Sequence, residues 1–325
     1  MSPLAIIMAK VTIIGATGNV GTFAAYAISA IPHVNEILLY GRAGRDALLK
    51  GIAQDLGDSF AARGTDIRVN WTTDLKDAAG SDIVVITAGV PRTPDQDRMD
   101  LATGNGRIIA TLAWEIGAIA PDTRILMVTN PVDVMTSVAL KYSGLQPNQV
   151  FGLGTHLDSM RLKSLIASYF QVHVSEVHTR IIGEHGESMV PLWSATTIGG
   201  IKISNLPEFS HLPVQDIIQS VKCSGQSIIQ NKGSTVYGPG EAIASLVRTV
   251  LSDENRILTV SAYVRREVHG IGDICIGVPA RINSKGVFPV AIRLDESEII
   301  AFRESVEKIR ERTNAVFEVL DAKPI

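Results

Sequence analysis

The chain has 325 residues, of which 46% are hydrophobic and 19% are charged, and its formal net charge is -3. These proportions are typical of a compact globular protein and exclude a disordered chain. Lysines and arginines are not clustered, so we expect no nucleic-acid partner. No apolar run approaches the roughly 18 residues that span a bilayer. At about 150 residues per domain, the length predicts two domains.

The two cysteines, Cys223 and Cys275, are far apart in the sequence and belong to no CxxC motif. This predicts neither a disulfide framework nor a cysteine metal site, and we expect reduced thiols and a cytoplasmic location. The segment from Met1 to Ala9 is apolar but lacks the basic start of a signal peptide. A second start at Met8 would account for it.

In the first half of the chain, short β-branched runs alternate with helical stretches. This is the pattern of a parallel sheet covered by helices on both faces. Runs such as Ile83 to Ile86 are apolar throughout, as expected of strands buried on both sides. We predict strands at Lys10 to Gly15, Glu36 to Tyr40, Asp66 to Trp71, Asp82 to Ala88, Ile125 to Thr129 and Gln149 to Gly152.

In the second half the pattern changes to mixed helices and strands, which predicts an α+β domain over residues 151–325. We expect a helix from Asp158 to Phe170 and a strand-rich stretch from Arg256 to Arg293. The last helix begins with Asp295 and Glu298, which are spaced as in a capping box. Its buried positions are predicted to be Val306, Ile309, Val316 and Leu320.

Three glycines follow the first predicted strand, in Gly15-Ala16-Thr17-Gly18-Asn19-Val20-Gly21. The segment leads into a helix, so the glycines lie where a dinucleotide pyrophosphate approaches a helix N-terminus. Alone, this spacing is also typical of a plain tight turn. After the first strand of a βαβ pattern it favours nucleotide binding. We therefore predict an α/β fold with a Rossmann-type doubly wound parallel sheet that binds NAD(P) over residues 1–150.

The second predicted strand ends in Leu39-Tyr40-Gly41-Arg42, where an acid usually binds the ribose 2′-hydroxyl of NAD. No acid is present here. Without its charge a 2′-phosphate is not repelled, and Arg42 is able to pair with it. We predict that NADP is accepted as well as NAD, and leave open which of them is preferred. The alternative interpretation of Arg42 is a solvated turn residue.

Three polar segments carry the candidate catalytic side chains. His185 lies among glycines and polar residues between Ile182 and Ser188, an unusual setting for a core histidine. Asp158 and Arg161 are three apart on a predicted helix, so both project from one face. Arg92 and Arg98 lie six apart in a polar loop after the fourth strand, and such a loop is able to close over a site. Each residue taken alone also suits a structural or solvated role.

Together these segments resemble the lactate/malate dehydrogenase family, and most of all its archaeal malate dehydrogenases of the lactate-dehydrogenase-like branch. The resemblance runs nearly the whole chain, from the glycine segment to the C-terminal helix. It includes Thr129-Asn130-Pro131, Gly154-Thr155-His156-Leu157-Asp158 and Gly183-Glu184-His185-Gly186. It implies reversible hydride transfer between NAD(P) and a 2-hydroxy acid.

The resemblance also implies a role for each candidate residue. His185 would exchange a proton with the substrate oxygen, and Asp158 would bind the other ring nitrogen. Arg161 would bind the C1 carboxylate, and Arg98 would polarise the C2 carbonyl when its loop closes. The substrate site would further include Arg92, Asn130 and Thr235. The cofactor groove would be lined by Gly15, Thr17, Gly18, Asn19, Val20, Gly21, Gly41, Arg42, Thr87, Ala88, Gly89, Asn105, Val128 and Asn130.

Arg92 lies where this family distinguishes its substrates. A neutral residue there suits lactate, whereas an arginine is able to pair with a second carboxylate, which favours malate and oxaloacetate. Two features depart from the usual malate pattern, namely the acidic loop from Thr93 to Asp97 and a threonine at Thr235. Lactate, or a broader range of L-2-hydroxycarboxylates, is therefore the alternative substrate.

Two other classes of protein are less well supported. A dinucleotide-binding protein that has lost catalysis is disfavoured because His185, Asp158, Arg161 and Arg98 are all present. An NAD-using glycosidase would need cysteine and histidine metal ligands that the sequence lacks. The expected partners are a small dicarboxylate substrate and further copies of the chain, in a dimer or a tetramer. We expect no metal, nucleic acid or membrane partner.

Overall fold

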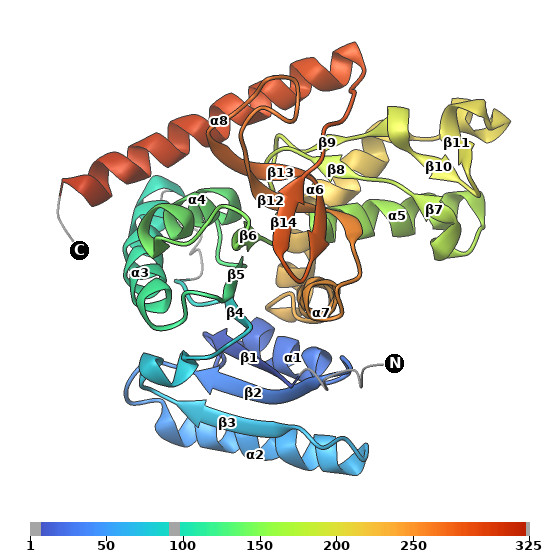
Figure 1. Ribbon diagram of the computed structural model, residues 1–325. Helices are drawn as coiled ribbons and strands as arrows, with labels where there is room; N and C mark the ends of the chain where they lie inside the picture. The colour runs from blue at the N-terminus through green and yellow to red at the C-terminus, as the bar shows by residue number, and fades with distance from the viewer. Residues whose placement is uncertain (1–7, 91–97, 323–325) are drawn as a thin grey trace, which may run out of the picture.

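The computed structural model describes residues 8–90 and 98–322 and contains a nine-stranded sheet (Figure 1). Its first six strands are β1 (Ala9–Ile14), β2 (Val34–Tyr40), β3 (Arg68–Thr72), β4 (Ile83–Ile86), β5 (Arg124–Met127) and β6 (Val150–Gly152). They run parallel in the order β3-β2-β1-β4-β5-β6, which is that of a Rossmann sheet. All six predicted strands are confirmed, and only their ends differ, by no more than two residues.

Successive residues of the central strands face opposite layers of helices. On β1, Val11 and Ile13 belong to one buried cluster and Ile14 belongs to another, because strand side chains alternate between the two faces. The first cluster includes residues of α1 (Asn19–Ile28) and α2 (Asp46–Ala62). The second includes residues of α3 (Arg98–Ile119) and α4 (Val132–Ser143). Burial on both faces explains why these strands are apolar throughout.

The second half of the chain extends the same sheet. β12 (Arg256–Val264) pairs antiparallel with β6, with Ser261 opposite Gly152, and then with β13 (Ile274–Asn283). β13 in turn pairs with β14 (Gly286–Pro289). The fold class is the predicted one, a Rossmann-type sheet followed by an α+β region. The predicted strand-rich stretch completes the first sheet instead of forming a separate one.

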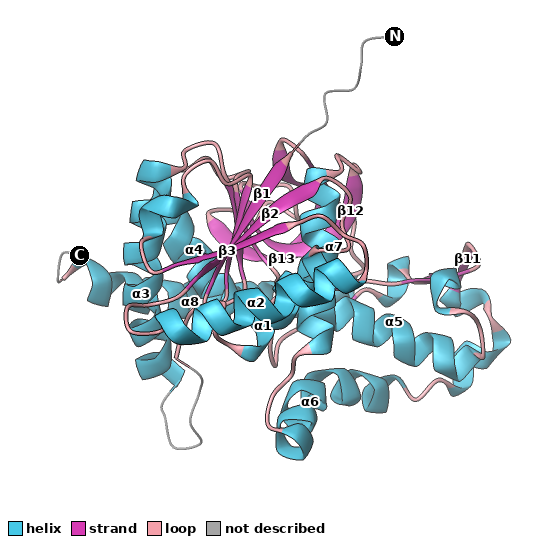
Figure 2. Ribbon diagram, turned by 90° about the horizontal axis from the view of Figure 1, so that it is seen from below, coloured by secondary structure: helices cyan, strands magenta, loops and turns pink. Residues whose placement is uncertain are grey.

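Several other elements of the second half project from the sheet on the side opposite α3 and α4 (Figure 2). They include α5 (His156–Phe170) and α6 (Val214–Lys232). These two helices contribute to one buried cluster, with Leu162 and Ile166 from α5 and Ile217 from α6. Two small sheets accompany them, in the orders β11-β10-β7 and β8-β9. Their strands are β7 (Val177–His178), β8 (Ile181–Ile182), β9 (Val190–Pro191), β10 (Thr197–Ile198) and β11 (Ile201–Lys202).

Two helices connect the halves. α7 (Tyr237–Leu251) packs on α1, where the rings of Phe23 and Tyr237 meet edge to face at 5.0 Å. α8 (Glu296–Asp321) contacts α3, α4 and β13 (Figure 1). Its predicted capping box between Asp295 and Glu298 is present, and its four predicted core residues are buried. No helix within residues 8–90 and 98–322 is long and apolar enough to cross a membrane.

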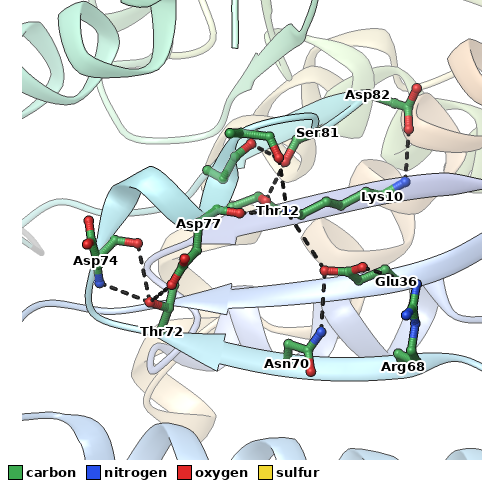
Figure 3. Close-up of polar contacts among 12 residues, drawn as sticks. Lys10, Thr12, Glu36, Arg68, Asn70, Thr72, Asp74, Asp77, Ser81 and Asp82 are labelled. Atoms are coloured by element: carbon green, nitrogen blue, oxygen red, sulfur yellow. Dashed lines mark hydrogen bonds and ion pairs between the residues drawn. The ribbon is translucent and has the colours of Figure 1, made fainter. Parts of the chain in front are cut away.

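Polar side chains connect neighbouring strands near their amino ends (Figure 3). Glu36 on β2 lies 3.8 Å from the Lys10 ammonium on β1 and 3.5 Å from the Arg68 guanidinium on β3. The backbone N–H of Lys10 donates to the Asp82 carboxylate at 2.9 Å, just before β4. These contacts lie at the end of the strands opposite to the glycine segment. They stabilise the strand order and leave the carboxyl ends free for a ligand.

Candidate active site

The glycine segment lies at the carboxyl end of β1, beside β4, where the strand order reverses. Gly15 has a φ of +89°, and a Cβ there would lie 2.7 Å from the backbone nitrogen of Ala88. A Cβ on Gly21 would lie 2.6 Å from the Gly15 carbonyl oxygen. Gly18 immediately precedes α1, and a Cβ there would lie at an ordinary contact distance of 3.4 Å from the Gly15 carbonyl oxygen. This backbone turn before a helix N-terminus fits a pyrophosphate group.

The ends of β4 and β5 form a wall next to this turn. The Thr87 hydroxyl donates to the carbonyl oxygen of Ile14 at 3.0 Å, and the Thr129 hydroxyl donates to that of Ala88 at 2.7 Å. A Cβ on Gly89 would lie 2.5 Å from the Thr129 methyl group. The three predicted groove residues after β4 are therefore brought together with the glycine segment.

Asn105 on α3 joins this wall to the next loop. Its side chain is 2% exposed; the oxygen accepts from Val90 N–H at 2.8 Å, and the nitrogen donates to the Asn130 carbonyl at 2.9 Å. The Asn105 amide therefore fixes two loops by their backbones. Asn130 itself is exposed and precedes a cis peptide bond to Pro131, while Val128 is half-buried.

A residue from the second half of the chain reaches the glycine segment. Asn19, the first residue of α1, donates from its side-chain amide to the Ser234 hydroxyl at 3.0 Å. This contact brings the loop between α6 and α7, with the half-buried Thr235, next to the predicted cofactor site. Thr17 and Val20 are also half-buried in the glycine segment. No local pattern predicts this contact, because the two segments are more than 200 positions apart.

The turn after β2 presents Arg42 to solvent. Gly41 is buried and donates its N–H to the Thr72 carbonyl at 3.2 Å. Arg42 is exposed, and none of the described acids forms an ion pair with it. Its guanidinium is therefore available to an anionic ligand.

His185, Asp158 and Arg161 form one connected group. The Asp158 carboxylate is 1% exposed; one oxygen lies 2.6 Å from His185 Nδ1 and the other lies 3.3 Å from an Arg161 nitrogen. The His185 side chain is 27% exposed, and its Nε2 has no hydrogen bond to any described residue. The Asp158 carboxylate therefore holds the His185 imidazole with Nε2 free and places it beside the Arg161 guanidinium, which is 17% exposed.

The Asp158 carboxylate raises the pKa of His185 to about 8. Burial opposes this effect because it disfavours the charged imidazolium, and the nearby Arg161 also lowers the pKa. The attraction to Asp158 outweighs both effects. The imidazole is therefore mostly protonated at neutral pH and is able to donate a proton from Nε2.

A buried acid that the sequence analysis did not single out supports the His185 backbone. Asp133, in the first turn of α4, is 2% exposed and accepts from the His185 N–H at 3.0 Å. Burial raises the pKa of Asp133 to about 6. The sequence signal was its place three residues after Asn130, in the Asn-Pro-Val-Asp run.

The residue before the histidine is held by α8. Glu184 is 6% exposed, forms an ion pair with Arg312, and accepts from the Ser188 N–H at 3.2 Å. The Ser305 hydroxyl accepts from the Glu184 N–H at 2.7 Å. α4 and α8 therefore both hold the loop that carries His185. Sequence reasoning missed Glu184, although it is the neighbour of the candidate histidine.

Two predicted substrate residues cannot be placed in this geometry. Arg92 lies outside the described residues. Arg98 is the first residue of α3, and its side chain is outside the described part of the structure. The roles expected of both arginines remain predictions.

Comparison with known proteins agrees with the geometry. Residues 9–152 match the lactate/malate dehydrogenase NAD-binding domain, and residues 155–320 match the lactate/malate dehydrogenase alpha/beta C-terminal domain. A malate dehydrogenase of Methanothermobacter thermautotrophicus is 48% identical, over 96% of this chain and 98% of that protein. An L-2-hydroxycarboxylate dehydrogenase (NAD(P)(+)) of Methanocaldococcus jannaschii is 49% identical, over 93% and 97%.

A crystal structure of malate dehydrogenase from Plasmodium falciparum superposes with a TM-score of 0.90 at 29% identity. The match covers 96% of this chain and 99% of that one. Sequence and structure comparisons therefore extend over both halves, including the glycine segment and the group around His185.

Proposed function

The chain belongs to the lactate/malate dehydrogenase family, and on that premise we propose that it interconverts (S)-malate and oxaloacetate with NAD(P). The observation that carries the proposal is the Asp158 carboxylate, which binds His185 on one side and Arg161 on the other. Such a group provides both a proton donor and a binding site for a substrate carboxylate. The name of the 48% identical relative supports malate as the substrate.

The cofactor site that we propose is the turn formed by Gly15, Gly18 and Gly21, with the wall from Thr87 to Gly89. The close packing at Gly15 and Gly21 supports this assignment, because a side chain at either position would clash with neighbouring backbone atoms and distort the turn. When bound, the nicotinamide supplies or accepts the hydride. Asn105 would act by positioning the loops at Val90 and Asn130, to which its amide is bound.

His185 would serve as the acid in reduction and as the base in oxidation. Its Nε2 is free to exchange a proton with the substrate, because the hydrogen bond with Asp158 engages Nδ1. As the imidazole accepts a proton, the carboxylate stabilises the imidazolium, which explains why its pKa is raised. The backbone contact from Asp133 to His185 would keep the ring in this place.

Arg161 would bind the C1 carboxylate of the substrate in a two-pronged ion pair. In the structure it is engaged with Asp158 through a single nitrogen at 3.3 Å, which leaves other donors for a ligand. Asn130 and Thr235 would complete the substrate pocket. We propose that Arg98 polarises the C2 carbonyl and that Arg92 binds the second carboxylate, on the sequence argument alone.

The alternative substrate is a broader set of L-2-hydroxycarboxylates, as the name of the Methanocaldococcus relative indicates for that protein. Steady-state reduction of oxaloacetate and of pyruvate, each with NADH and NADPH, distinguishes the two. We expect a strong preference for oxaloacetate, and an Arg92→Gln variant should shift it towards pyruvate. Equal or better turnover of pyruvate by the wild type would contradict the malate assignment.

We propose that NADP is accepted because Arg42 is exposed and unpaired among the described residues, where an acid would repel the 2′-phosphate. Arg42→Asp should lower kcat/KM for NADPH roughly tenfold or more, through the loss of a charge-assisted contact, and leave NADH nearly unaffected. Lys50→Asp, the same charge change on the exposed side of α2, is the matched control. Equal use of both cofactors, unchanged by Arg42→Asp, would refute the proposal.

We further propose that residues 1–150 act as the cofactor domain and residues 151–325 as the substrate domain of a homodimer or homotetramer. Light scattering during gel filtration should give a mass of two or four times 34.9 kDa. A mass equal to one chain at assay concentration would contradict the oligomer.

A further inference from the structure

A cavity of about 410 Å³ is lined by residues of α4, α8, β12 and β13. None of the described residues given a role in the reaction lines it. Its size is within the range of small-molecule sites.

Two guanidinium groups give the cavity a positive character. Arg265 is exposed, and none of the described acids is within ion-pair distance of it. Arg310 on α8 lies 3.6 Å from Glu307, an exposed partner whose attraction is screened by water. Arg310 also donates to the Gly272 carbonyl at 3.2 Å, and its remaining N–H groups are available to a ligand.

One acid, Asp273, also lines the cavity, but its carboxylate accepts from the Tyr263 hydroxyl at 2.8 Å. Lys141 also lines the cavity but is paired with Asp321 at 2.7 Å. Three basic side chains therefore accompany one acid in the lining, and the two arginines have capacity for an anion.

The lining also includes apolar side chains and one buried threonine. Leu140 on α4, Ile274 on β13 and Phe317 on α8 supply the apolar surface. Thr313 on α8 is 6% exposed, and its Oγ1 has no hydrogen-bond partner among the described residues. The oxygen is closed off from solvent, so a molecule in the cavity does not reach this hydroxyl.

We propose that this cavity binds a small carboxylate with an apolar body. The carboxylate pairs with Arg265 and Arg310, and the apolar body packs against Leu140 and Phe317. A ligand that has only a charge contacts the arginines alone, and a ligand that has only an apolar body contacts the apolar side chains alone. Each binds more weakly than a ligand that has both.

The two helices that line the cavity also hold the His185 loop. α4 contributes Ser137 and Leu140 to the cavity, and its Asp133 accepts from the His185 N–H at 3.0 Å. α8 contributes Thr313, and its Arg312 is paired with Glu184. Occupancy therefore alters turnover through these helices, without occupying the substrate site. This coupling rests on the proposed function, whereas binding to the cavity does not.

Benzoate is a suitable probe, with benzyl alcohol as its uncharged counterpart. Calorimetric titration of the full-length protein should show saturable benzoate binding in the millimolar range and much weaker binding of benzyl alcohol. The double variant Arg265→Gln with Arg310→Gln should weaken benzoate binding roughly tenfold or more, because it removes both charged contacts. Arg266→Gln, an exposed neighbour that does not line the cavity, is the matched control and should bind normally.

The substrate site also attracts carboxylates, so Arg161→Gln separates the two sites. Benzoate binding that persists in Arg161→Gln and is lost in the double variant supports the cavity. Binding that is lost in Arg161→Gln and kept in the double variant overturns the proposal, as does the absence of saturable binding at millimolar concentration.

Kinetics test the coupling separately. In the wild type, benzoate should change kcat for oxaloacetate reduction at saturating substrate, and the double variant should abolish that change. Purely competitive inhibition that the double variant does not alter would overturn the coupling. A protein that binds benzoate in the cavity but reduces neither oxaloacetate nor pyruvate would contradict the proposed function and leave the binding site standing.

Discussion

The two sides of the proposed active site are built in different ways. The cofactor side consists of backbone in close contact, with Gly15, Gly21 and Gly89 packed so tightly that a Cβ would lie within 2.7 Å of its neighbours. The substrate side consists of side-chain charges, with Asp158 shared between His185 and Arg161. The first side is therefore sensitive to shape and insensitive to pH. The second side is sensitive to charge and pH.

The largest expected effect is the removal of the proton donor on the charged side. His185→Asn should lower kcat about 10²- to 10⁴-fold, because general acid-base catalysis contributes that much. NADH affinity, measured by fluorescence titration, should not change, since the cofactor side is a separate structure. His211→Asn, at an exposed histidine, is the control. A loss of less than tenfold in kcat would contradict the role of His185.

An intermediate effect is expected on the backbone side. Gly15→Ala introduces a side chain at a φ of +89° and 2.7 Å from the Ala88 nitrogen. It should reduce the free energy of unfolding in urea by about 1–3 kcal/mol and weaken NADH binding. Gly18→Ala is the matched control, because a Cβ there has room, and it should affect stability by less than about 1 kcal/mol. Equal destabilisation by both variants would show that the tight packing of Gly15 does not matter.

The pH dependence distinguishes the two sides directly. Because the pKa of His185 is raised to about 8, kcat/KM for keto-acid reduction should be constant at neutral pH and fall as pH rises through about 8, where the imidazolium loses its proton. Alcohol oxidation should show the opposite limb. Asp158→Asn removes the largest cause of the raised pKa, so it should move both limbs to lower pH. The affinity for NADH, measured over the same pH range, should stay constant. A pH-dependent affinity would contradict the distinction between the two sides.

The smallest effect is expected at the second acid next to the histidine. Asp133 also raises the pKa of His185, but it contributes less than Asp158 does. Asp133→Asn keeps an oxygen that accepts from the His185 N–H and removes the charge. The pH limb should therefore move in the same direction as in Asp158→Asn, and by less. A shift as large as that of Asp158→Asn would mean that the Asp133 charge controls the protonation of His185 as strongly as the Asp158 charge does, which contradicts the assignment of Asp158 as its main partner.

The sequence by itself determined the elements and most of the candidate residues. The apolar run from Ile83 to Ile86 indicated a strand buried on both faces, and the capping pair Asp295 and Glu298 indicated the start of the last helix; both are confirmed. The placement of Asp158 and Arg161 on one helix face followed from helical spacing, and the structure shows them 3.3 Å apart. These features depend on residues close together in the chain, where periodicity and local hydrogen bonds decide the structure.

Only the tertiary structure decided which distant segments meet. The contacts of Asn19 with Ser234, of Asp133 with His185 and of Arg312 with Glu184 join residues that no local pattern relates. The same is true of β12, which joins the Rossmann sheet at β6 although it lies in the second half of the chain. Such contacts arise from packing over the whole fold, because loop closure between distant segments is compensated only when many buried contacts form together.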